Sequence, residues 1–98
     1  MIIISDINVL EKVNFEKLEI LKLSYNKITD INVFEKVNFK ELKFLNLRNN
    51  KLSSIKIFKN LHFEKLESLY LENNQINLNN EKAIIKFLKS NLDCFYIN

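Results

Sequence analysis

The feature that most constrains this chain is a repeat with a period of 24 residues. The segment LEILKLSYNKI (residues 18–28) returns as LKFLNLRNNKL (residues 42–52) and again as LESLYLENNQI (residues 66–76). Each copy has apolar residues at offsets 1, 4, 6 and 11 and an asparagine at offset 9. A fixed period of this length is typical of a solenoid, in which every unit buries its apolar side against its neighbours. The sequence therefore predicts a stack of similar units.

The segments between these copies keep the same register. Phe15, Phe39 and Phe63 follow one another at intervals of 24 residues, and we expect them to stack as a second internal spine. The connecting segments are short and rich in β-branched residues, which favours short helical or 3-10 turns over long helices. The candidate caps of the first two turns are Asp6 or Asn8, and Asp30 or Asn32; both asparagines precede a glutamate by three residues, as in a capping box.

The last connecting segment, NNEKAIIKFLKSN (residues 79–91), has a stronger helical pattern than its counterparts. It predicts an α-helix over about residues 80–90, capped by Asn79 or Asn80. The helix is expected to bury one apolar face formed by Ile84, Phe87 and Leu88.

The pattern L-x-x-L-x-L-x-x-N-x-I/L resembles the leucine-rich repeat family, and its period is similar to that of the shorter-period members. The resemblance implies an α/β repeat solenoid, wound as a right-handed superhelix with a concave parallel sheet and convex short turns. We expect one domain over residues 1–98. Its units are a partial repeat (1–17), three repeats (18–41, 42–65 and 66–91) and a partial repeat (92–98).

Asparagine has a structural role in this scheme. The chain contains neither Gly nor Pro, so asparagine is expected to supply the turns, because it tolerates left-handed backbone conformations. Buried backbone groups at the bend after each strand also need a partner, and an amide side chain offers both donors and an acceptor. We expect Asn26, Asn50 and Asn74 to form a structural ladder that bonds these groups.

The predicted sheet has an outward face that can bind a partner. If Leu21 and Leu23 point into the core, alternate residues of the strands point out. Exposed aromatic and apolar side chains beside the single arginine have the composition of a protein-binding hot spot, and the resemblance implies binding on the concave face. Isolated exposed apolar residues are also normal on any surface. The candidate partner-binding residues are Ile20, Lys22, Phe44, Asn46, Arg48, Tyr70, Glu72 and Tyr96.

The charge pattern and the cysteine content limit the classes of partner and the cellular compartment that we expect. The net charge of +3 comes from lysines dispersed among glutamates, which favours a solvated mixed-charge surface over nucleic-acid binding. No apolar segment approaches the length of a membrane span, so no membrane partner is expected. The single cysteine, Cys94, excludes an internal disulfide framework and favours an intracellular, cytoplasmic setting.

Catalysis has little support in the sequence. His62 is the only histidine and is expected to be an exposed polar residue, while no basic neighbour in sequence activates the Cys94 thiol. One histidine and one cysteine are too few ligands for a metal site, and a chain without glycine has no glycine-rich phosphate loop. We therefore expect no enzyme activity, no cofactor and no metal.

The leading hypothesis is a non-catalytic protein–protein interaction module. The alternative is a structural or assembly unit, or a fragment of a longer repeat protein, that self-associates through ends without polar caps. In that case a homodimer is expected through the edge formed by Cys94, Phe95, Tyr96 and Ile97. Enzyme function survives only if the chain was cut from a longer protein that bears a catalytic domain.

Overall fold

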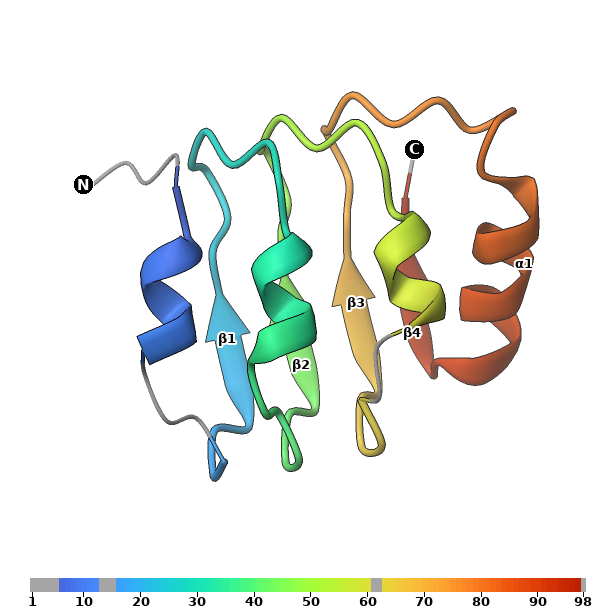
Figure 1. The fold of residues 1–98 in the computed structure, drawn as a ribbon. Helices are drawn as coiled ribbons and strands as arrows, with labels where there is room; N and C mark the ends of the chain where they lie inside the picture. The colour runs from blue at the N-terminus through green and yellow to red at the C-terminus, as the bar shows by residue number, and fades with distance from the viewer. Residues whose placement is uncertain (1–5, 13–15, 61–62, 98) are drawn as a thin grey trace.

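The computed structural model describes residues 6–12, 16–60 and 63–97 of the chain. Strands form one layer and the helical segments the other, with the first helical segment at one end of the array and α1 at the opposite end (Figure 1). The elements in chain order are η1 (Asn8–Lys12), β1 (Ile20–Lys22), η2 (Asn32–Lys36), β2 (Phe44–Asn46), η3 (Lys56–Lys59), β3 (Ser68–Tyr70), α1 (Lys82–Asn91) and β4 (Cys94–Tyr96).

The strands form one parallel sheet in the order β1-β2-β3-β4. The register follows the repeat, because Leu21 pairs with Leu45 and Leu45 pairs with Leu69. Between β3 and β4 the offset grows by two residues, as Leu69 pairs with Phe95. The predicted repeat solenoid, with a parallel sheet and short helical turns, is confirmed.

The strand phase is also the predicted one. Leu45 and Leu69 are fully buried, and the residues on either side of them in each strand are partly exposed. Leu21 is only partly buried, since β1 lies at an edge of the sheet. The core therefore lies between the sheet and the helical layer, and the other face of the sheet is open.

The turns after the strands contain residues in the left-handed region. Tyr25, Asn49 and Asn73 have φ angles of 59°, 57° and 59°. Each of them immediately precedes an asparagine of the expected ladder, so left-handed conformation and ladder bonding fall on different residues. Asparagine adopts this conformation at low cost, whereas a tyrosine does not.

The described part of the phenylalanine spine is present. Phe39 is 3% exposed, and its ring centroid lies 5.6 Å from that of Phe34 and 5.7 Å from that of Phe63. Phe15, the first expected member, lies outside the described residues. These edge-to-face and tilted contacts fill the space between successive helical turns.

Of the candidate caps of the first two turns, the aspartates bond the backbone, and the capping box expected at Asn32 is wrong. Asn32 is the first residue of η2, and the N-cap residue, Ile31, has no side-chain capping bond. Instead, the Asp30 carboxylate accepts a hydrogen bond from the Asn32 backbone N–H at 2.7 Å, and Asp6 does the same for Asn8 at 2.9 Å. The aspartates thus bond the backbone two residues ahead, the local bond that short side chains make at turns.

The helix α1 begins at Lys82, and neither Asn79 nor Asn80 caps it. Their backbone N–H groups donate to the side-chain oxygen of Asn77, which forms the preceding turn and leaves both asparagines exposed. The N-cap residue is Glu81, which makes no side-chain capping bond.

The predicted apolar face of α1 is correct in two residues and wrong in one. Ile84 and Leu88 are buried, but Phe87 is 49% exposed. Glu81 lies on the same side of the helix as Ile84, Ile85 and Leu88, since residues three, four and seven positions apart share one side. Phe87 therefore falls outside this stripe.

Glu81 is 4% exposed and connects α1 to the preceding repeat. Its Oε1 accepts a hydrogen bond from the Ile55 backbone N–H at 3.3 Å, at the entrance of η3. Its Oε2 is buried and has no hydrogen-bond partner among the residues that the structure describes. This buried carboxylate was not expected from the sequence.

Candidate functional site

The ladder asparagines bond the turn backbone of their own repeat and of the preceding one. The Asn50 side-chain nitrogen lies 2.9 Å from the Leu23 carbonyl oxygen and 3.0 Å from that of Leu47, and its side-chain oxygen accepts from the Ile28 N–H at 3.2 Å. Asn74 makes the corresponding bonds one repeat later, and Asn26 bonds the Leu23 carbonyl at 2.9 Å. These side chains hold the repeats together.

The open sheet face carries a row of aromatic side chains across three strands. The ring centroids of Phe44 and Tyr70 lie 4.9 Å apart, and those of Tyr70 and Tyr96 lie 5.1 Å apart, both nearly perpendicular. Phe44 and Tyr70 occupy diagonal positions, since Phe44 pairs with Ser68 and Tyr70 with Asn46. The small side chain of Ser68 leaves room for this diagonal contact. We call Phe44, Tyr70 and Tyr96 the aromatic row.

The aromatic row ends in exposed apolar and aromatic surface. Ile20 pairs with Phe44 across β1 and β2 and is 55% exposed, and Tyr96 on β4 is 51% exposed. Lys22 is exposed on the same face and pairs with Asn46, which is partly buried. The sheet register thus places six candidate partner-binding residues side by side.

Arg48 and Glu72, the other two candidates, form an ion pair just beyond the strands. The Arg48 Nε lies 3.4 Å from the Glu72 Oε2, and the two side chains are 40% and 23% exposed. Both the Arg48 Nε and the Glu72 Oε1 are buried and make no directed hydrogen bond with the described residues. The pair is therefore held by charge and proximity, and it fixes two opposite charges beside the aromatic row.

Ion pairs also connect neighbouring repeats elsewhere. The Lys65–Glu41 pair, at 2.8 Å, lowers the pKa of Glu41, because Lys65 both donates a hydrogen bond to its carboxylate and carries a positive charge. The Glu19 carboxylate, at 3.1 Å, raises the pKa of Lys43 in the same way. These exposed pairs favour the observed stacking register, and each contributes little to stability.

The described residues contain no candidate metal site. No group of three or more His, Cys, Asp and Glu residues comes together in this part of the chain. Cys94 is a partly buried free cysteine, and His62 lies outside the described residues. No helix in the described segments is long and apolar enough to span a membrane.

The four residues of the predicted self-association edge lie on different sides of β4. Tyr96 belongs to the open sheet face, and Cys94 shares its strand phase, whereas Phe95 and Ile97 pack partly against the core. β4 itself is an outer strand of the described sheet.

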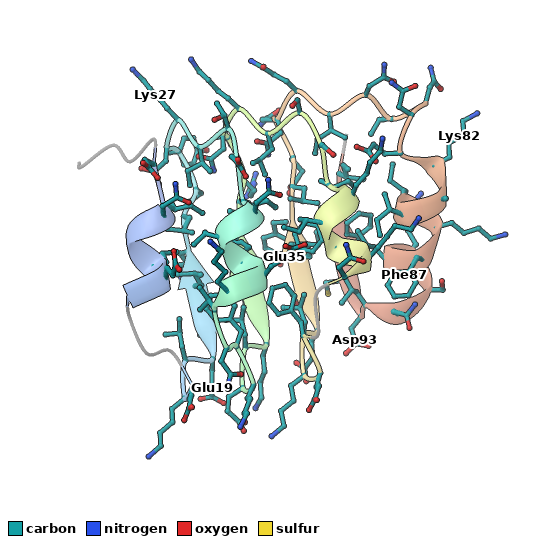
Figure 2. All side chains as sticks on the ribbon, viewed as in Figure 1. Glu19, Lys27, Glu35, Lys82, Phe87 and Asp93 are labelled. Atoms are coloured by element: carbon teal, nitrogen blue, oxygen red, sulfur yellow. The ribbon has the colours of Figure 1, made fainter. Side chains whose placement is uncertain are left out.

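The structure adds a surface that the sequence reasoning missed. A hollow of about 480 Å³ lies at the α1 end of the array, beside Ile97. Three exposed lysines of α1, at residues 82, 86 and 89, line it. Their spacing on one side of a helix was visible in the sequence, but the position of Ile97, which follows β4, beside α1 required the fold. Figure 2 shows Lys82 directed away from the array.

Comparison with known proteins gives a consistent picture. Two family models of leucine-rich repeats match the chain: a model of two copies matches residues 16–60, and a model of one repeat matches residues 65–89. Among solved structures, the chain is similar to a crystal structure of an internalin from Listeria monocytogenes, with 30% sequence identity and a TM-score of 0.73. This match covers 98% of the chain and 27% of the internalin chain. No curated protein matches the chain.

Proposed function

The chain belongs to the leucine-rich repeat family, and on that basis we propose that it is a non-catalytic module that binds a protein partner on the concave face of its sheet. Domains of this family generally mediate protein–protein interaction. Because the chain spans about a quarter of the internalin chain that it resembles, the identity of the partner is not carried over from that protein.

The aromatic row is the observation that supports this proposal most strongly. Its rings are in contact at 4.9 and 5.1 Å, so they form a continuous apolar strip rather than isolated exposed residues. Contact between the rings also restricts their rotamers before a partner arrives, which lowers the entropy lost on binding. Aromatic anchors of this kind carry much of the energy of protein interfaces.

The charges beside the row favour a polypeptide over a nucleic acid. The face carries Lys22 and the Arg48–Glu72 pair, so both positive and negative groups lie on it. A nucleic-acid surface requires an excess of positive charge to neutralise phosphates. A mixed rim around an apolar strip is the arrangement of a protein interface.

Site-specific photocross-linking tests the proposal with matched positions. Tyr96 on the concave face and Phe87 on α1 are 51% and 49% exposed, so a cross-linking amino acid at either position is equally accessible. We expect position 96 to capture a protein that position 87 does not. With that protein purified, Tyr96→Ala should weaken Kd about tenfold or more, and Phe87→Ala should leave it within about twofold. Equal effects of the two substitutions would contradict binding on the concave face.

A second candidate function is self-association through β4. Among the described strands, β4 has β3 as its one neighbour, and an outer strand presents unpaired backbone groups to another chain. A symmetric dimer through this edge should shift toward monomer in a Tyr96→Lys variant, as measured by sedimentation velocity. A parent protein that sediments as a monomer at every soluble concentration would exclude this function.

A further inference from the structure

The end of the array formed by α1 has an apolar centre. Leu78 is 41% exposed, and the partly buried Ile85 and Ile97 lie beside it around the hollow of about 480 Å³. Leu78, Ile85 and Ile97 come from the loop before α1, from α1 and from the residue after β4, so only the fold brings them together. We call these residues, together with Lys82, Lys86 and Lys89, the end face.

The rim of the end face is positively charged. Lys82, Lys86 and Lys89 are exposed and line the hollow, and among the described residues no carboxylate lines it with them. Their spacing of four and three residues places them on one side of the helix. The end face therefore combines an apolar centre with charges of a single sign.

Elsewhere in the array, basic residues pair with glutamates across the boundary between repeats. Four ion pairs in the described part of the chain join a basic residue of one repeat to a glutamate of the adjacent one: Lys36–Glu11, Lys43–Glu19, Lys65–Glu41 and Arg48–Glu72. None of these pairs includes a lysine of the end face. The complement of the end face is therefore a surface that presents carboxylates around apolar side chains.

We propose that the end face docks a segment of another protein that carries acidic side chains. The segment places apolar residues against Leu78, Ile85 and Ile97 and sets carboxylates against the three lysines. A second copy of this chain is a poorer occupant, because a symmetric contact would bring two sets of three lysines together. The surface is separate from the aromatic row and does not depend on binding there.

A charge-swapped copy of the chain supplies the probe. The variant K82E/K86E/K89E carries glutamates around the same apolar centre, and the three positions are exposed, so we expect the fold to be retained. In sedimentation velocity at low ionic strength, an equimolar mixture of parent and variant should associate with a Kd about tenfold tighter than that of either protein alone. The complex should dissociate as salt is raised, because exposed charges are screened.

A further variant separates the apolar contribution from the charges. Leu78→Ser removes exposed apolar surface from the end face and should weaken the mixed complex, while Phe87→Ala, outside the hollow, should not. The double variant K82E/K86E replaces the triple variant if circular dichroism shows that the latter is unfolded.

Three outcomes would overturn the proposal. In the first, the mixture sediments as two separate monomers at low ionic strength, which shows that the end face has no affinity for acidic polypeptide. The parent alone can associate as tightly as the mixture, which identifies a second copy as the occupant. A fluorescent oligothymidylate can bind the parent through these lysines more tightly than the charge-swapped variant does, which identifies a nucleic-acid surface instead.

Discussion

Asn50→Ala is the substitution that tests the asparagine ladder most directly. Asn50 is 6% exposed, and its amide contacts four backbone groups, two in the preceding repeat and two in its own. The three carbonyl oxygens keep another donor when the amide is removed. The Asn26 amide still bonds the Leu23 carbonyl, the Asn74 amide bonds that of Leu47, and the Tyr25 N–H bonds that of Arg48.

The Ile28 N–H has no such substitute. Its hydrogen bond to the Asn50 side-chain oxygen, at 3.2 Å, is buried, and alanine leaves the donor unpaired. Leaving a buried donor unsatisfied costs about 1–3 kcal/mol, so we expect the free energy of unfolding to fall by about that amount. Asn50→Asp should cost more than Asn50→Ala, because it retains the acceptor for Ile28 but sets a carboxylate against three carbonyl oxygens.

Urea unfolding followed by circular dichroism measures these differences, since the chain contains no tryptophan. A lower midpoint with an unchanged m-value reports a change in stability. Asn38→Ala, at an exposed asparagine on the helical side, is the control and should be nearly neutral. The ladder reasoning is refuted if Asn50→Ala matches this control, or if Asn50→Asp is more stable than Asn50→Ala.

Three further predictions concern single sites. Tyr25→Asn should raise the free energy of unfolding by about 1 kcal/mol, because asparagine tolerates the φ of 59°. The tyrosine is 55% exposed, so its replacement removes little packing. An unchanged Tm would show that the tyrosine conformation is not strained. Glu81→Ala removes the acceptor of a buried backbone N–H and should cost about 1–3 kcal/mol, whereas Glu81→Gln keeps an acceptor without a charge and should be more stable than Glu81→Ala in thermal melts. Equal losses would indicate that the bond is unimportant. The folded-state pKa of Glu41 is lowered by Lys65, so its contribution to stability is present above the unfolded-state pKa and is lost as pH falls through the folded-state value. An NMR titration should show a higher Glu41 pKa in Lys65→Gln but not in Lys59→Gln, and no shift in either variant would contradict the ion pair.

The repeat pattern was sufficient to predict the architecture. A period of 24 residues requires equivalent residues to occupy equivalent positions in successive units, so the parallel order, the register and the inward leucines follow together. The ladder positions follow for the same reason, because each bend repeats the same backbone problem. The register of the repeat also makes Ile20 a neighbour of Phe44, and Tyr70 a neighbour of Tyr96, on the open face.

Contacts between residues that are not related by the period required the folded chain. The diagonal packing of Phe44 on Tyr70 depends on how the two rings are oriented across Ser68. The inward position of Glu81 depends on the orientation of α1, which follows a connecting segment two residues longer than the others. The helical pattern of residues 79–91 assigned Phe87 to the buried face, yet the orientation of α1 leaves Phe87 exposed. The end face has the same origin, because its lysines come from one helix while its apolar centre is assembled from three separate segments. A one-dimensional repeat specifies what stacks on what, whereas the direction of each side chain at an irregular unit is settled by packing against its neighbours in space.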